Sequence, residues 1–134
     1  MRILAIETSC DETAISLLET SDGILFDVLA HEVSSQIDVH KEFGGVVPML
    51  AKREHTRILP IILAKILNSK LNPLAGGQNS KLADLIAVTY GPGLEPALWT
   101  GIKFAQELAV KWNVPIVAVD HMEGHIVSAM LKRM

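Results

Sequence analysis

The sequence contains a single cysteine and no long apolar stretch, and each absence narrows the class of protein. Cys10 is the only cysteine among the 134 residues. The chain therefore has no disulfide framework, as is typical of proteins from a reducing compartment. No apolar run approaches the roughly 20 residues that a membrane-spanning helix needs. Residues 1–7 become charged too soon for a signal peptide. These absences predict a cytoplasmic protein with no membrane partner.

The sequence also lacks an excess of positive charge. Twelve Lys and Arg residues are outnumbered by 15 Asp and Glu residues, which gives a net charge of −3. This balance argues against broad, non-specific binding of nucleic acid. An RNA contact would need a local basic patch or another subunit. The hydrophobic fraction of 49% and the charged fraction of 20% are typical of a globular protein, and the length fits one domain.

Short apolar runs separated by polar turns predict five strands. The first three follow one another closely and predict an antiparallel meander. The last two are apolar throughout, as in a sheet covered on both faces. The expected strands are residues 3–6, 13–18, 24–34, 85–88 and 116–119.

Helical periodicity lies between and after the later strands. Residues 50–67, 95–112 and 126–133 are the expected helices, and Pro60 should kink or split the first of them. The charged run at residues 52–57, which includes His55, is expected to be a solvated helix face, or else a contact for a partner or RNA. Residues 35–42 are expected to be irregular, with His40 at the surface. Residues 68–81 are expected to form a flexible loop.

The first candidate site is the polar tip between the first two strands. It includes Ser9, Cys10, Asp11 and Glu12 and supplies hydroxyl, thiol and carboxylate groups within residues 7–12. Such a tip can donate backbone N–H groups to a phosphate or bind a cation through its carboxylates. It is also compatible with an ordinary solvated turn.

The second candidate site is the Gly91-Pro92-Gly93 loop at the end of the fourth strand. Ligands of α/β folds bind at such strand ends, and residues without a Cβ let a phosphate or base approach the backbone. The loop is not a Walker loop, because no Gly-Lys-Ser/Thr follows it. A rigid strand-to-helix turn is the alternative.

The third candidate site is the pair His121 and His125, which follows the last strand. Asp120 is a plausible helix cap, and on a helix two histidines four residues apart share one face. They could bind zinc, iron, nickel or copper, or they could make only local hydrogen bonds. Zinc proteases place Glu directly after the first His. Here Glu123 comes two residues after it and should point about 200° away. Gly124 is expected to let another segment pack closely.

A mixed sheet would bring these three candidate loops toward one edge. Together, and in this order, they resemble the amino-terminal part of the TsaD family, the tRNA threonylcarbamoyltransferase subunit once called O-sialoglycoprotein endopeptidase. The resemblance covers essentially the whole chain. It rests on the segments Ile6-Glu7-Thr8-Ser9-Cys10-Asp11-Glu12-Thr13, Gly44-Gly45-Val46-Val47-Pro48, Gly91-Pro92-Gly93-Leu94 and His121-Met122-Glu123-Gly124-His125.

The resemblance implies one α/β lobe of a two-lobed actin-like ATPase (RNase H-like) fold, with residues 1–134 as the first lobe and the second lobe absent. It implies transfer of threonylcarbamoyl from threonylcarbamoyl-adenylate to the anticodon-adjacent adenosine of tRNA. His121 and His125 would bind iron or zinc, with a third ligand in the second lobe. Gly91 and Gly93 would accept the nucleotide or the adenylate. The tip from Ser9 to Glu12 would lie near the phosphate and metal.

The same resemblance implies a TsaB-type paralogue, a TsaE-type ATPase and tRNA as partners, with the helix near residues 52–67 as the contact for the paralogue. The last helical pattern reaches Met134 without a capping residue, so we expect a chain cut short and inactive alone. The alternative is a non-catalytic module that binds the paralogue whether or not the histidines are intact. A metalloprotease is the remaining possibility.

Overall fold

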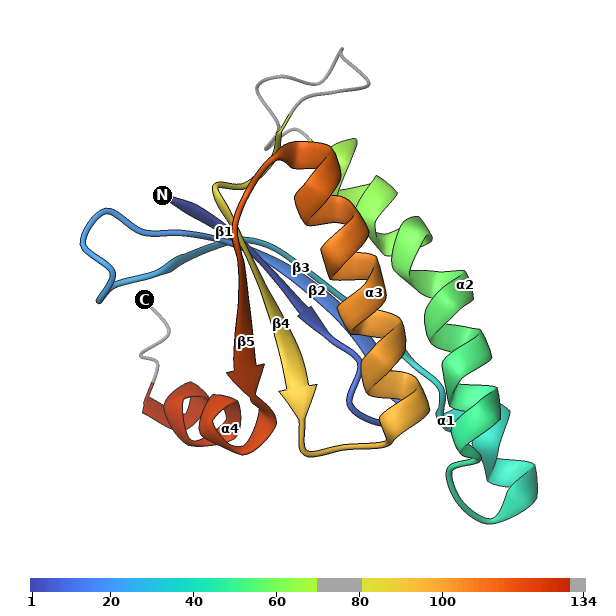
Figure 1. The fold of residues 1–134 in the computed structure, drawn as a ribbon. Helices are drawn as coiled ribbons and strands as arrows, with labels where there is room; N and C mark the ends of the chain where they lie inside the picture. The colour runs from blue at the N-terminus through green and yellow to red at the C-terminus, as the bar shows by residue number, and fades with distance from the viewer. Residues whose placement is uncertain (70–80, 131–134) are drawn as a thin grey trace.

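A five-stranded mixed sheet in the order β3-β2-β1-β4-β5 is the framework of the computed structural model (Figure 1). The structure describes residues 1–69 and 81–130. β1, β2 and β3 form an antiparallel meander, β4 is parallel to β1, and β5 is parallel to β4. This confirms the predicted arrangement of the strands. The expectation that the fifth strand is buried was wrong, because Ile116 and Val117 are exposed in the described chain. The strands are β1 (Arg2–Glu7), β2 (Glu12–Glu19), β3 (Asp27–Ser35), β4 (Leu85–Gly91) and β5 (Ile116–Asp120).

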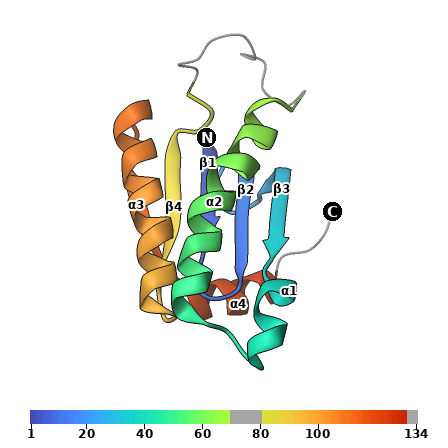
Figure 2. The same ribbon diagram turned by 90° about the vertical axis from the view of Figure 1, so that its right-hand side faces the viewer.

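Two long helices, α2 (Pro48–Leu67) and α3 (Glu95–Trp112), lie side by side on one face of the sheet (Figures 1 and 2). The helix α4 (His121–Met130) begins directly where β5 ends. The short helix α1 (Ile37–His40) and a 3₁₀ turn, η1 (Lys41–Phe43), connect β3 to α2. The prediction of an irregular segment at residues 35–42 was therefore wrong for most of its length.

Apolar side chains from the sheet and from α2 and α3 form one buried cluster. Burial alternates along β1 and β2, as expected for strands with one face toward a core. Each fully buried Leu or Ile contributes about 1.5–3 kcal/mol relative to exposure. The cluster fixes the strands against the helices, so the ends of the strands are held in place. Its fully or almost fully buried members include Leu4, Ile6, Ile15, Leu17, Leu59, Ile66 and Ile86.

Pro60 lies inside α2, which nevertheless continues to Leu67 without a break. Pro60 was expected either to kink or to split the helix, and the split is therefore wrong, while the kink stays a prediction. Pro60 is on the exposed side of α2. Because proline has no N–H, the carbonyl of Thr56 has no helical hydrogen-bond donor, and on this side it can face water. Neighbours of Pro60 on the other side of the helix, including Leu59 and Ile62, are buried. Their packing outweighs the roughly 3 kcal/mol cost of an internal proline.

Two histidines that were expected at the surface are buried. His40 is 4% exposed and His55 is 0% exposed. His55 Nδ1 lies 2.7 Å from Thr13 Oγ1, and its Nε2 donates to the Cys10 carbonyl at 2.9 Å. Hydrogen bonds offset the cost of burying the polar ring, so a histidine in a charged run can still face the core.

His40 belongs to the same buried network. Its Nε2 donates to Gln36 Oε1 at 2.8 Å, and its Nδ1 accepts the Val47 N–H at 3.2 Å. The Gln36 backbone N–H donates to the Asp11 carbonyl at 2.8 Å. The network therefore links α1 and α2 to the loop that follows β1.

The start of the third strand was predicted too early. Asp22 Oδ1 accepts the N–H groups of Ile24 and Leu25, both at 2.9 Å, which holds these residues in a turn until β3 begins at Asp27. Most of the predicted loop at 68–81 and the end of the predicted helix at 126–133 lie outside the described residues. Among residues 1–69 and 81–130, no helix is long and apolar enough to cross a membrane.

Candidate functional site

The carboxyl ends of β1, β4 and β5 meet at one edge of the sheet, next to the start of α4 (Figure 1). Glu7 is the last residue of β1, and Thr89 lies near the end of β4. Asp120 ends β5, and His121 begins α4. Parallel strands place their carboxyl ends together, so residues far apart in sequence converge here. The prediction that the three polar loops lie at one edge is confirmed.

The loop after β1 packs tightly against the loop after β4. The Leu94 N–H donates to the Ser9 carbonyl at 2.8 Å. A Cβ on Gly93 would lie 2.6 Å from the Ser9 carbonyl oxygen, so only glycine allows this approach. The backbone of Ser9 thus occupies the space in which a side chain at Gly93 would lie. Around Gly91, in contrast, nothing described lies within 4 Å of a Cβ position.

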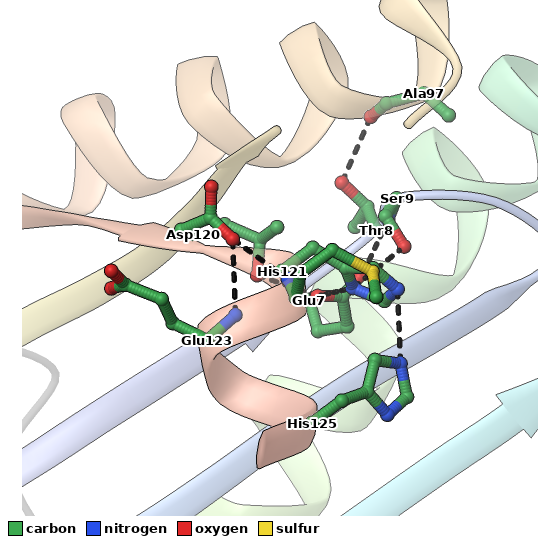
Figure 3. Close-up of polar contacts among 10 residues, drawn as sticks. Glu7, Thr8, Ser9, Ala97, Asp120, His121, Glu123 and His125 are labelled. Carbon is green, nitrogen blue, oxygen red and sulfur yellow. Dashed lines mark hydrogen bonds and ion pairs between the residues drawn. The ribbon is translucent and has the colours of Figure 1, made fainter. Parts of the chain in front are cut away.

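The same loop is also fixed to the first turn of α3. Thr8 Oγ1 donates to the Ala97 carbonyl at 2.8 Å (Figure 3). Gly101 lies one turn further along the helix, and a Cβ there would overlap Thr8 Oγ1. Close contact at Gly93 and Gly101 holds the segment from Thr8 to Ser9 in a defined position beside His121.

Asp120 caps α4 and orients its first turn. Its Oδ1 accepts the N–H groups of Met122 at 2.8 Å and Glu123 at 3.0 Å, which confirms the predicted cap. His121 and His125 then lie on the same side of the helix (Figure 3). Their Nε2 atoms are 3.0 Å apart, and the two rings are perpendicular.

Glu7 contacts the first histidine of this pair. Its Oε2 lies 3.2 Å from His121 Nδ1 and accepts the Thr89 hydroxyl at 2.5 Å. Its Oε1 accepts the Ser9 N–H at 2.5 Å. Burial alone would raise the pKa of Glu7, but hydrogen bonds from Ser9, Thr89 and His121 outweigh burial and lower this pKa. Glu7 is therefore a carboxylate at neutral pH.

The geometry of the histidine pair fits a shared metal ion. Two nitrogens bonded to one zinc ion at about 2.0–2.1 Å and a tetrahedral angle are roughly 3.3 Å apart. The observed 3.0 Å between the Nε2 atoms is close to this value. Within residues 1–69 and 81–130, no group of three or more His, Cys, Asp or Glu residues could hold a metal. The described chain thus offers two candidate ligands for such an ion, and further ligands would have to come from elsewhere.

Of the predicted tip residues, Ser9 makes a polar contact with a histidine of the pair. Ser9 Oγ lies 3.3 Å from His121 Nδ1, so Ser9 belongs to the cluster. In the described part of the chain, the side chains of Asp11 and Glu12 make no hydrogen bond to either histidine. Burial raises the pKa of Cys10, and the nearby Asp11 adds to the effect. Its thiol is therefore protonated at neutral pH, a poor state for a nucleophile.

Glu123 points away from both histidines, as its position in the sequence predicted (Figure 3). A zinc protease needs this carboxylate beside the metal as the general base, so the arrangement does not support proteolysis. No described atom lies within 4 Å of a Cβ on Gly124, so the expected close packing at that glycine is not found in the described chain.

Thr89 was not among the predicted site residues, and Glu7 was predicted only as one of the carboxylates of the polar tip at residues 7–12, with no role of its own. The sequence contained a usable signal, because each lies at the end of an apolar run that was predicted to be a strand. In the sheet Ile6 pairs with Val88, which places the following residues Glu7 and Thr89 side by side. An expected parallel pairing of these strands would have brought both residues to the site.

Solved structures with similar folds define the class of protein. YeaZ from Pseudomonas aeruginosa matches with a TM-score of 0.55 at 22% identity, over 90% of this chain and 43% of its own. RuvC from Thermus thermophilus, solved with a Holliday junction substrate, matches with a TM-score of 0.55 at 15% identity, over 96% of this chain and 72% of its own. At these identities the likeness concerns the fold, which is that of an RNase H-like, actin-like ATPase lobe.

Sequence comparison then identifies the family. The family model described as "TsaD: tRNA N6-adenosine threonylcarbamoyltransferase" matches residues 27–134. A transferase of that name from Thermosipho melanesiensis is 46% identical over 129 residues, 94% of this chain. Another, from an Anaeromyxobacter species, is 46% identical over 132 residues, 98% of this chain. The chain belongs to the TsaD family. It spans about a third of the length of these curated relatives, covering 35% and 36% of them.

Proposed function

We propose that this chain is the first lobe of a tRNA N6-adenosine threonylcarbamoyltransferase and supplies the histidine ligands of its metal. The observation that carries the proposal is the pair of Nε2 atoms of His121 and His125, 3.0 Å apart in a member of the TsaD family. The complete enzyme would transfer the threonylcarbamoyl group from threonylcarbamoyl-adenylate to an adenosine beside the tRNA anticodon. Because the chain spans a third of its relatives, it is inactive by itself.

The residues of this lobe have separate roles in the proposal. His121 and His125 bind a divalent ion, iron or zinc. Such an ion acts as a Lewis acid on carbamoyl or phosphate oxygens when bound. The segment at Ser9 lies against His121 and lines the site. The open space beside Gly91 leaves room for the nucleotide part of the adenylate.

We further propose that the α2–α3 face binds a TsaB-type paralogue. A groove of about 530 Å³ runs between these helices, lined by residues that include Met49, Lys52, Trp99 and Lys103. Met49 is 63% exposed and Trp99 is 49% exposed. Exposed Trp and Met beside charged residues are typical of protein interfaces. The other proposed partners are a TsaE-type ATPase and tRNA, and the assembled complex would contact the tRNA. The proposed location is the cytoplasm.

A chimera tests the proposed activity. This chain would replace the matched third of the Thermosipho melanesiensis relative, and formation of threonylcarbamoyladenosine in tRNA would be measured by nucleoside mass spectrometry. We expect the chimera to be active. Replacing His121 or His125 with Ala should lower the rate about 100-fold or more, since loss of Lewis-acid stabilisation costs several kcal/mol.

The matched control is His31→Ala, which removes an exposed imidazole on β3 that contacts Ser16. This variant should retain activity and metal content. Metal content, measured by atomic emission, should fall in His121→Ala. A fully active, metal-loaded His121→Ala chimera would refute the assignment of the ligand.

A further inference from the structure

Two hydrogen bonds, one to each oxygen, hold the carboxylate of Glu7 in place beside His121. The Ser9 N–H donates to Oε1 and the Thr89 hydroxyl donates to Oε2, both at 2.5 Å. Thr89 is 7% exposed and belongs to the sheet, so its hydroxyl position is set by packing. Glu7 thus presents Oε2 at a fixed point, 3.2 Å from His121 Nδ1 (Figure 3).

This contact determines which nitrogen of His121 carries the proton. A carboxylate oxygen offers only lone pairs, so Nδ1 must be the donor. Ser9 Oγ, 3.3 Å from the same nitrogen, is also able to accept. In the neutral ring, Nε2 is then unprotonated, and Nε2 is the atom that faces His125. The Glu7 carboxylate therefore favours the tautomer whose free lone pair points into the histidine pair, and the Ser9 hydroxyl is compatible with it.

We propose that Glu7 is a positioning residue that fixes the Nδ1–H tautomer and the ring orientation of His121, so that Nε2 is presented as a metal ligand. The inference rests on the proposed function, since it assigns to Glu7 a role at the same site. A carboxylate that accepts a hydrogen bond from a ligating histidine orients the ring and raises its basicity. Removal of such a partner typically lowers metal affinity 10- to 100-fold.

Glu7→Gln provides the sharpest test, because the amide reverses the hydrogen bonds made at Oε2, while the Thr89 hydroxyl can accept as well as donate. The oxygen of the new amide has to accept the Ser9 N–H. The NH₂ group therefore takes the place of Oε2 and faces His121 Nδ1. An NH₂ donor requires Nδ1 to accept, which favours the opposite, Nε2–H tautomer. The matched control is Glu42→Gln, the same change at an exposed residue of η1.

The first readout is the imidazole ¹⁵N spectrum of the metal-free 134-residue chain, which distinguishes protonated from unprotonated ring nitrogens. We expect the Nδ1–H tautomer of His121 in the unsubstituted chain and in Glu42→Gln, and the Nε2–H tautomer in Glu7→Gln. An Nε2–H tautomer in the unsubstituted chain overturns the inference, and this measurement needs no variant to fold. Glu7→Asp retains the charge but has a shorter side chain. This variant should also lose the preference of His121 for the Nδ1–H tautomer.

The second readout is zinc affinity, measured by calorimetry with zinc chloride added to the metal-free chimera described above, which carries the rest of the enzyme, and to the same variants of it. We expect Glu7→Gln to weaken binding 10- to 100-fold and Glu42→Gln to leave it unchanged. If His121→Ala abolishes binding but Glu7→Gln changes neither affinity nor tautomer, the role of Glu7 is refuted and the metal site stands. If the tautomer responds to Glu7→Gln but zinc does not bind the unsubstituted chimera, the positioning role stands and the proposed ligand role is contradicted.

Discussion

Single buried side chains tie the loop of the candidate site to the helix layer. His55 is fully buried and donates from Nε2 to the carbonyl of Cys10, one residue after Ser9. Its Nδ1 accepts the Thr13 hydroxyl, so the ring bridges α2, β2 and the loop. Only a neutral imidazole can accept at one nitrogen and donate at the other, so the network requires the uncharged form.

The first prediction at this scale is a loss of stability in mild acid. Burial lowers the pKa of His55 from its ordinary 6.5, although the Cys10 carbonyl, Glu7 and Asp11 oppose the effect. The unfolded chain therefore takes up a proton below about pH 6.5 that the folded chain resists. The stabilisation is fully present above that pH and is lost as the pH falls below it. Urea unfolding between pH 7.5 and 5 should show this decline.

His55→Gln separates this contribution from the titration of other groups. The variant should be about 1–3 kcal/mol less stable at pH 7.5, because buried hydrogen-bonding groups lose a partner. Its stability should fall less steeply between pH 6.5 and 5. His31→Gln, an exposed control, should keep the original slope. Equal slopes in His55→Gln and the original chain would show that His55 is not responsible.

At the scale of elements, α3 is positioned by its contact with the loop after β1. Gly101 makes this contact possible, since a Cβ there would meet Thr8 Oγ1. Thr8 in turn donates to the Ala97 carbonyl, in the first turn of α3. The contact connects the packing of α3 to the position of Ser9, and so to the candidate metal site.

Gly124→Ala should stabilise the protein, whereas Gly101→Ala should not. Within a helix, Gly→Ala normally stabilises by about 1 kcal/mol. At Gly101 the overlap with Thr8 should cost about 1–3 kcal/mol, which cancels or exceeds that gain. At Gly124, with open space around it, the gain should remain. Urea midpoints at constant slope measure both changes, and a stabilised Gly101→Ala would contradict the close contact.

At the scale of the whole molecule, the helix layer and the site lie on different parts of the lobe. The α2–α3 groove lies on the face of the sheet that these helices cover, while the histidines lie at the end of β5. A partner could therefore bind the groove without covering the histidines. Partner binding and metal binding should be separable by mutation.

Trp99→Glu tests this separation. We expect it to weaken binding to a TsaB-type paralogue by about 2 kcal/mol or more, roughly 30-fold, because aromatic residues at the centre of an interface contribute most of its energy. Val110→Glu, on the same helix but outside the groove, is the matched control. His121→Ala should leave the affinity unchanged. Calorimetry of the purified pair measures all three, and full affinity in Trp99→Glu would exclude this face.

The sequence alone determined the order and type of the main elements, because periodicity and turn residues act locally. Residues 95–112 were predicted to be a helix and are α3, and the spacing of His121 and His125 predicted their shared face. The family was also evident from short motifs in a fixed order. These features depend on neighbours within a few residues, which a linear sequence displays directly.

Only the tertiary structure decided which distant residues meet. Glu7 contacts His121 across 114 residues because parallel pairing of β1, β4 and β5 aligns their carboxyl ends. His55 is buried in a charged segment because Thr13 and Cys10 supply hydrogen-bond partners from other elements. Contacts of this kind depend on sheet register and helix packing, and no local pattern encodes them.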